Sequence, residues 1–437
     1  MPNLYRTQMN NPNQPAADTL HNTWQNRNPG SPGWLQTFQK SALAEFAQTG
    51  FPTTRMEDWK YTDVRKLAAA YPQWLINQAA QNTDNTSNSL EIDQAIRVVF
   101  VNGIYNAEKS TQNLPEYIQV GKLSELATKY PELLKKKLGK LAKNTDSGFI
   151  AINTAFSETA IIILLPDNTE LQQPIHIEYF SSAEKTSVQP RVLVDLGTNS
   201  KATIVEHFSS SVAAITNTVT EIHCSAGSDL TYYRLQEEHI EAWHTAVQYI
   251  HLERDASVNA IIIDCGALLA RNEMRLCLAG PGATADVKGL LLADGSRHID
   301  SRLSVEHAAR ETRSCEHYRS ILADKARGVF NGRILVQQEA QKTVAQLTNR
   351  NLLLNPGTEI NTKPELEIYA DDVKCAHGAT TGKLDEASMF YLLSRGIDPV
   401  AARNILVAAF ASELLTDIQI PAVVEHAQNA MRALRLS

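Results

Sequence analysis

A long run of short apolar segments is the feature that most constrains the fold of this chain. The segments are rich in β-branched residues and are separated by Gly, Asn and Asp turn signals, with no convincing amphipathic helix between them. They extend over residues 149–383 and include AIIILLP, IHIEYF, RVLVDL, ATIVEHF, NAIIID, GRILVQ and ELEIYA. This pattern predicts an all-β solenoid, sandwich or barrel rather than a doubly wound α/β fold. The unbroken length favours a stacked solenoid, with ~20 residues per coil.

The two flanking regions have a helical pattern. Residues 1–148 are expected to form a loose N-terminal arm over 1–32 and then a helical region. Apolar residues at four-residue spacing predict a helix over 34–49 that Gly50 ends, and a second helical run covers 122–143. Residues 384–437 are expected to form a C-terminal helical domain, in which an Asp-Pro pair at 398–399 is a typical helix start.

Charge and cysteine content narrow the class of protein. The net charge of −7 over 437 residues argues against a nucleic-acid partner, since such binders are usually basic. No apolar stretch approaches the ~18 residues of a membrane span, and the first residues have no secretory signal pattern. Five cysteines without a CxxC motif are typical of a reducing compartment. We therefore expect a cytoplasmic protein that binds neither membrane nor nucleic acid.

The chain has no complete motif for self-contained catalysis. The string from Gly378 to Leu384 resembles a phosphate loop, but its glycine spacing is one residue short and Leu384 replaces the Mg²⁺-binding hydroxyl. There is also no HExxH, no GxSxG and no GxGxxG after a strand. Clustered carboxylates of the kind that a β-solenoid polysaccharide lyase or hydrolase needs are absent as well. We expect a protein that is not an enzyme.

Cys375 and His377 are the sharpest candidates for metal ligands. If they lie on a strand, both side chains share one face, with Cα atoms ~6.6 Å apart. Two donors are too few, because structural zinc and iron–sulfur clusters take about four protein ligands. Either a partner chain completes the site, or the pair is an ordinary buried thiol and a hydrogen-bonded histidine. A second C-x-H, Cys315 and His317, follows three further polar residues that a solenoid could stack near it: His298, Asp300 and His307.

Several long strings resemble the SufB/SufD family of iron–sulfur cluster assembly scaffolds. Within residues 284–412 they include HIDSRLSVEH, KPELEIYADDVKCAHGATTGKLDE and MFYLLSRGIDPVAARNILVAAF. Near the N-terminus, GFPTTRMEDWKYTDVRKL is similar to the Trp-Lys-Tyr-Thr signature of the family. Gly378 after His377, and Leu392 after the Phe-Tyr pair, resemble the SufD branch; the SufB branch is the alternative.

The resemblance implies a fold, partners and a role. It implies a right-handed parallel β-helix core flanked by N-terminal and C-terminal helical regions. The C-terminal end of the β-helix would meet a SufB-like paralogue, or a second copy when the chain is isolated, and the C-terminal helices would dock a SufC-like ABC ATPase. His377 and Cys375 would form a half-site for a transient iron–sulfur cluster, with no cofactor stably bound by the isolated chain. A purely structural adaptor for these partners, without a ligand role, is the alternative.

Overall fold

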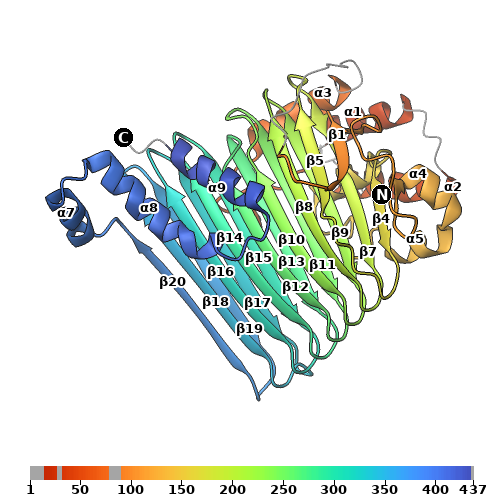
Figure 1. Ribbon diagram of the computed structural model, residues 1–437. Helices are drawn as coiled ribbons and strands as arrows, with labels where there is room; N and C mark the ends of the chain where they lie inside the picture. Colours follow the sequence, from red (N-terminus) through yellow and green to blue (C-terminus); the bar gives the residue numbers. More distant parts are fainter. Residues whose placement is uncertain (1–13, 27–31, 78–89, 435–437) are drawn as a thin grey trace, which may run out of the picture.

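A two-sheet parallel β-solenoid forms the centre of the computed structural model, which describes residues 14–26, 32–77 and 90–434 (Figure 1). The mainly β fold class is thereby confirmed. One sheet, sheet A, has the order β2 (Ile104–Tyr105), β1 (Ile96–Val101), β5 (Ile175–Ser181), β8 (Lys201–Ser210), β10 (Asp229–Gln236), β12 (Ser257–Asp264), β14 (Thr284–Ala293), β16 (Arg313–Leu322), β18 (Val344–Leu353) and β20 (Lys374–Gly382). The other, sheet B, has the order β3 (Gln119–Lys122), β4 (Ile161–Leu165), β7 (Arg191–Leu196), β9 (Ile215–Cys224), β11 (Trp243–Leu252), β13 (Leu269–Leu278), β15 (His298–His307), β17 (Arg327–Val336) and β19 (Glu359–Ile368), with β6 (Ser187–Val188) beside β9.

Each coil is longer than the ~20 residues that we expected. Residues paired between successive coils are 26 apart at Trp243↔Leu269 and 32 apart at Arg327↔Glu359. The expectation was wrong because a coil contributes one strand of about ten residues to each sheet and also needs two turns. The strands also begin earlier than residue 149, since β1 pairs in parallel with β5.

The interior between the sheets is filled by alternate side chains of both sheets. The apolar ones form one continuous cluster that extends from Ile96 in β1 to Ala345 and Leu347 in β18. Helices cover part of the opposite face of each sheet, so strands such as β5 and β9 are buried on both sides and have nearly continuous apolar runs, whereas strands such as β17 and β18 alternate along much of their length between buried and more exposed residues.

The N-terminal helices cover the outer face of sheet B. They are α1 (Gln14–Asn26), α2 (Gly33–Thr49), the short 3₁₀ helix η1 (Glu57–Trp59), α3 (Arg65–Asn77), α4 (Leu123–Lys129), α5 (Pro131–Lys137) and α6 (Gly148–Ala155). Aromatic residues such as Phe46 and Tyr71 pack here against Ile215 and Leu269.

Two expectations for this region were wrong. The segment expected as an arm contains α1, whose Leu20 and Trp24 are buried, whereas 1–13 and 27–31 lie outside the described residues. The run over 122–143 is two helices rather than one, since Pro131 cannot continue a preceding helix. The helix that Gly50 ends is confirmed: this glycine follows α2 with φ 63°.

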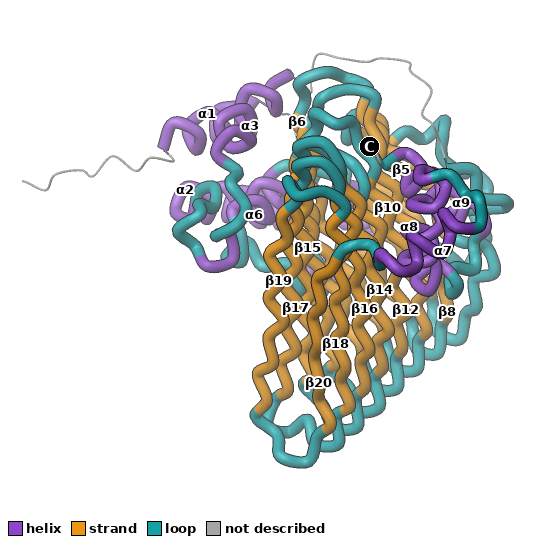
Figure 2. Tube along the Cα trace, turned by 90° about the vertical axis from the view of Figure 1, so that its left-hand side faces the viewer, coloured by secondary structure: helices purple, strands orange, loops and turns teal. Residues whose placement is uncertain are grey.

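The C-terminal helices cover the outer face of sheet A, opposite the N-terminal helices (Figure 2). They are α7 (Glu386–Ser394), α8 (Pro399–Leu415) and α9 (Pro421–Ala433), and the expected start of α8 is confirmed, with Asp398 as its N-cap. α8 and α9 pack on the sheet, whereas α7 extends beyond the last coil (Figure 1). Among the described residues, no helix has both the length and the apolar character needed to cross a bilayer.

Candidate functional site

The last coil of the solenoid is uncovered. β19 and β20 are the terminal strands of their sheets, and in the described part of the chain each pairs only with the preceding strand, β17 or β18. No residue of β19 is buried, and every residue of β20 except Cys375 is exposed. The interior of the solenoid therefore opens to solvent at this end, and the outer edge of each terminal strand presents unpaired backbone groups.

Cys375 and His377 both face this open end. They pair in register with Ala345 and Leu347 of β18, which belong to the interior cluster. Because paired residues of neighbouring strands point to the same side of the sheet, both side chains point into the solenoid rather than outward. Cys375 is half-buried against the interior cluster, and His377 is exposed. The structure thus brings the two sequence-predicted residues together on one face; their role as ligands stays a prediction.

The thiol of Cys375 is in its neutral form in the isolated chain at neutral pH. Burial raises the pKa of Cys375, a hydrogen bond with the Ala345 backbone lowers it in part, and the charge of Glu316 raises it further. Because a thiolate is the metal-binding form, an incoming metal ion would have to displace this proton.

Glu316 is a buried acid near the open end that the sequence analysis did not single out. It lies on β16 in the same interior row as Leu347 and His377, and its side chain is fully buried. Burial raises the pKa of Glu316 to about 8, so this carboxyl is mostly neutral at pH 7. The alternation in the string SCEHY, which puts Glu316 on the face of Ser314 and Tyr318, was the available signal.

The second C-x-H pair lies on the opposite side of sheet A. Cys315 and His317 face outward from β16, and the Cys315 Sγ is 3.1 Å from the His317 Nε2. Burial raises the pKa of Cys315 and lowers that of His317, so both are held in their neutral forms. The sheet separates this pair from Cys375, so the two C-x-H strings do not form one site.

The three upstream polar residues have structural partners instead of converging on the second pair. Asp300 forms an ion pair with Arg271 and accepts a hydrogen bond from Thr62 at 2.6 Å, and His298 contacts the same threonine at 3.0 Å. His307 contacts hydroxyls within its own coil, those of Thr312 and Ser314. These three residues therefore stabilise the packing of the solenoid and do not add ligands to the pair Cys315 and His317.

The remaining sequence candidates are also structural. The string that resembles a phosphate loop begins inside strand β20, so its residues from Gly378 to Gly382 are extended strand rather than a loop that could wrap a phosphate. All five cysteines are free, and burial raises the pKa of Cys224 to about 12 and that of Cys277 to about 11. These two thiols are correspondingly unreactive.

Comparisons with known proteins agree with the solenoid and its flanking regions. A family model described as the SufBD core domain of SUF system FeS cluster assembly matches residues 179–410, and one described as the SufBD protein N-terminal region matches residues 19–177. An iron–sulfur cluster assembly SufBD family protein of Synechocystis is 33% identical over 389 residues, 84% of each chain. Iron–sulfur cluster assembly protein SufD of Escherichia coli is 29% identical, over 85% of this chain and 86% of that protein. The chloroplastic protein ABCI7 of Arabidopsis thaliana is 27% identical, over 93% of this chain and 87% of that protein. The predicted family is thus confirmed, and the chain belongs to the SufBD family of iron–sulfur cluster assembly proteins.

Proposed function

We propose that the chain is a SufD-like, non-catalytic scaffold subunit on which an iron–sulfur cluster is assembled as cargo. The observation that carries this proposal is the uncovered last coil, where Cys375 and His377 face the open interior. Because a cluster needs about four protein ligands, a partner must supply the others. The cluster is then shared and transient, and the isolated chain holds none stably. A cytoplasmic location, expected from the cysteine content, stays a prediction.

The partner at this end is proposed to be a SufB-like paralogue. The exposed edges of β19 and β20 can pair with the corresponding edges of a protein with the same coil geometry. Pairing would bring a second set of interior side chains opposite Cys375 and His377. The same edges would let the isolated chain form a homodimer.

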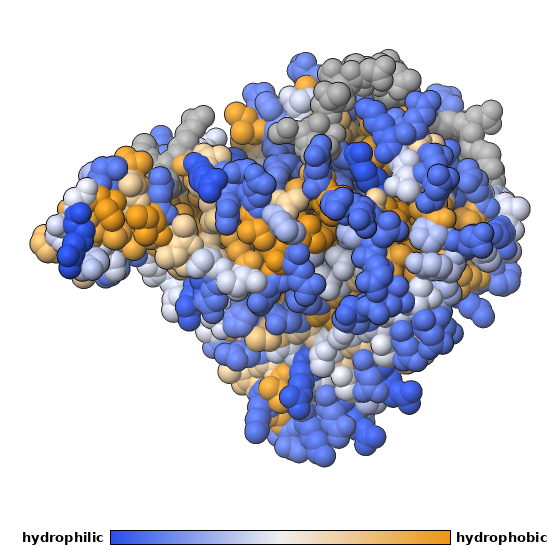
Figure 3. Space-filling model, viewed as in Figure 1, coloured by the Kyte–Doolittle hydropathy of each residue, from blue (hydrophilic) through white to orange (hydrophobic). Residues whose placement is uncertain are grey.

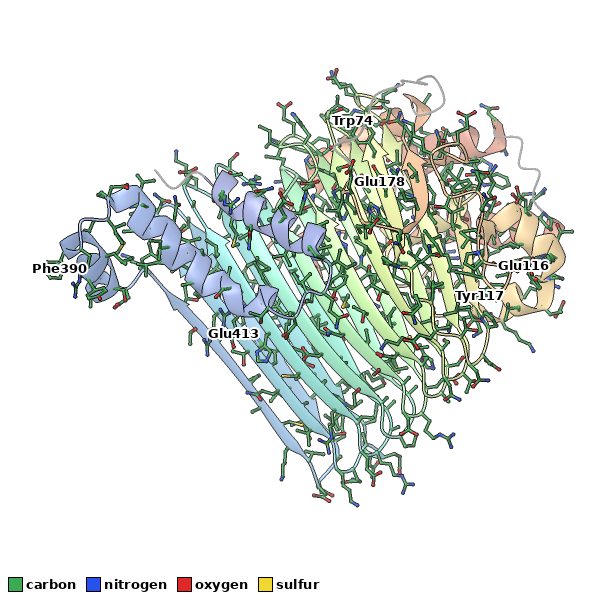
Figure 4. The ribbon with its side chains drawn as sticks, viewed as in Figure 1. Trp74, Glu116, Tyr117, Glu178, Phe390 and Glu413 are labelled. Atoms are coloured by element: carbon green, nitrogen blue, oxygen red, sulfur yellow. The ribbon has the colours of Figure 1, made fainter. Side chains whose placement is uncertain are left out.

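The C-terminal helices are proposed to dock a SufC-like ABC ATPase. α7 has no buried residue, and it carries Phe390 with 73% of its surface exposed and Tyr391 with 57%. Figure 4 shows Phe390 at the tip of the projection, and Figure 3 shows apolar surface gathered there. Val400 and Ile405 of α8 add to this surface. An apolar projection of this kind is typical of a protein–protein contact.

The test of the half-site is cluster assembly in the reconstituted complex with SufB-like and SufC-like subunits. His377→Ala, and separately Cys375→Ala, are expected to lower bound iron and sulfide and the visible absorbance of the cluster. Matched controls are His251→Ala and Cys277→Ala, because these residues are ladder neighbours on the outer face of sheet B. Cluster yields equal to that of the wild-type complex in both test variants would leave the chain as a structural adaptor, the alternative function.

The docking surface needs a separate test. Deleting residues 384–437 would uncover apolar residues of sheet A such as Ile261 and Leu290, so loss of binding would be ambiguous. The double variant Phe390→Ser/Tyr391→Ser changes only exposed side chains and is expected to weaken retention of the SufC-like subunit in a pull-down. Unchanged retention would contradict docking through α7.

A further inference from the structure

Two histidines and a glutamate meet where α9 crosses the solenoid, far from the open end. His207 lies on β8, Glu237 directly follows β10, and His426 lies on α9. One donor atom of each residue lies within 4.8 Å of those of the other two. Among the described residues, no other three or more His, Cys, Asp or Glu side chains bring their ligand atoms this close together.

The carboxylate of Glu237 lies between the two imidazoles. Its Oε1 is 2.6 Å from the Nε2 of His207, and its Oε2 is paired with the Nε2 of His426. The two rings are 5.3 Å apart at an interplanar angle of 73°. Both histidines therefore direct their Nε2 atoms at the same carboxylate, and each Nε2 contacts a different oxygen of it.

The group of His207, Glu237 and His426 is buried on the side of His207 and reaches solvent on the side of the other two residues. The His207 side chain is fully buried, whereas the side chains of Glu237 and His426 are 24% and 20% exposed. The Nδ1 of His207 has no hydrogen-bond partner among the described residues, so its proton can stay there while Nε2 offers its lone pair. An ion can thus reach the group from solvent without opening the sheet.

We propose that His207, Glu237 and His426 bind one divalent transition-metal ion, which fastens α9 to the solenoid. Two imidazoles and one carboxylate are a donor set that Zn²⁺ and Fe²⁺ accept, with water in the open position. Ligand atoms around tetrahedral Zn²⁺ lie about 3.3 Å apart, so the Nε2 of His207 and the Oε1 of Glu237 must separate by less than ~1 Å. In the ion-bound form each imidazole would be neutral with its proton on Nδ1, so a proton lying in either nitrogen–oxygen contact would have to move to Nδ1 or to solvent as the ion enters.

Such an ion would link segments that are far apart in the chain. It would join two neighbouring coils to the last helix, whose apolar residues Val423, Ala427 and Met431 already pack on the outer face of sheet A. Because the ion binds only when α9 is docked, it would stabilise the docked arrangement. This role is independent of the half-site at Cys375 and His377.

The test uses the full chain stripped with a chelator and titrated with Zn²⁺ against a chromophoric competitor. The wild-type chain is expected to bind one equivalent, and Glu237→Gln and His426→Gln to lose at least ~100-fold in affinity, since even outer-shell changes cost 10–100-fold. Circular dichroism without metal checks that both variants fold. Hydrogen exchange gives a second readout, in which Zn²⁺ should slow exchange of α9 amides in the wild-type chain only.

Two controls locate the ion. His21→Gln changes an exposed histidine of α1, and the double variant Cys375→Ser/His377→Gln removes both donors at the open end; both are expected to bind Zn²⁺ like the wild type. Loss of the ion in the double variant would overturn the proposal. So would a wild-type chain that binds no stoichiometric Zn²⁺, or retained affinity in Glu237→Gln and His426→Gln, because the three residues would then be an ion-paired network only.

Discussion

The buried carboxyl of Glu316 should make the stability of this protein depend on pH in an unusual direction. Burial raises the pKa of Glu316 from 4.5 to about 8. Between these values the folded protein keeps a proton that the unfolded chain releases, so folding becomes less favourable as pH rises. At 1.36 kcal/mol per pKa unit, the contribution of Glu316 to the free energy of unfolding falls by about 5 kcal/mol between a pH below 4.5 and a pH above 8. About 3 kcal/mol of this contribution is already lost at pH 7.

The substitution Glu316→Gln removes this ionisation and keeps the shape of the side chain. Urea unfolding followed by circular dichroism at pH 5, 7 and 8.5 gives the free energy of unfolding of variant and wild type. The variant is expected to gain stability relative to the wild type by about 4 kcal/mol between pH 5 and pH 8.5. A constant offset from burying an amide does not affect this comparison, because it does not change with pH.

Glu339→Gln is the matched control, since this glutamate is exposed in a turn. It should follow the wild-type curve at all three pH values. If the difference between Glu316→Gln and the wild type stayed within about 1 kcal/mol from pH 5 to pH 8.5, the carboxyl would ionise as readily in the folded protein as in the unfolded chain. The inference that Glu316 is a neutral acid in the folded protein would then be wrong.

Three further substitutions test the packing around the solenoid. Glu221→Gln removes the carboxylate that lies 2.6 Å from the fully buried guanidinium of Arg191. The cation keeps its hydrogen bonds to Asn153 and Thr154 but loses its counter-charge, so the free energy of unfolding in urea should fall by about 3–5 kcal/mol. Asp398→Ala removes the N-cap of α8 and should cost about 1 kcal/mol, with faster hydrogen exchange in the first turn of that helix. Gly289→Ala would place a Cβ 2.1 Å from the buried ring of Tyr318. This clash should lower the free energy of unfolding by about 1–3 kcal/mol and lower the melting temperature of the variant.

Local patterns were sufficient to predict many elements of this fold, but not α1, the division at Pro131 or the strands before residue 149. Apolar runs gave the strands, and capping residues gave helix limits, as at Gly50 and Asp398. The length of a coil could not be read in this way, because stacked coils share geometry rather than side-chain identity. The nearest approach to a repeat lies in the turns before sheet A, where residues about one coil apart have positive φ: Asn168, Asn199, Gly227, Asp255, Gly282, Glu311 and Lys342. Asn, Asp and Gly tolerate that conformation best, but Glu311 and Lys342 hide the pattern.

The candidate sites also differ in how far the sequence alone predicts them. Cys375 and His377 are two residues apart, so strand periodicity alone puts them on one face. His207, Glu237 and His426 come from two coils and a helix, and only the register of β8 and β10 and the position of α9 bring them together. Glu316 looked like an ordinary charged residue until the structure showed that it faces inward.

The uncovered last coil has a consequence for how proteins of this shape diverge. A stack of coils has no intrinsic length, because each new strand offers the next one the same row of amides and carbonyls. A second protein that continues the stack would be held largely by main-chain groups, which substitutions do not remove. Two related chains could then drift far apart in sequence and still join end to end. Discrimination between correct and incorrect companions would fall to the few inward-pointing side chains at the joint, of which His377 is one.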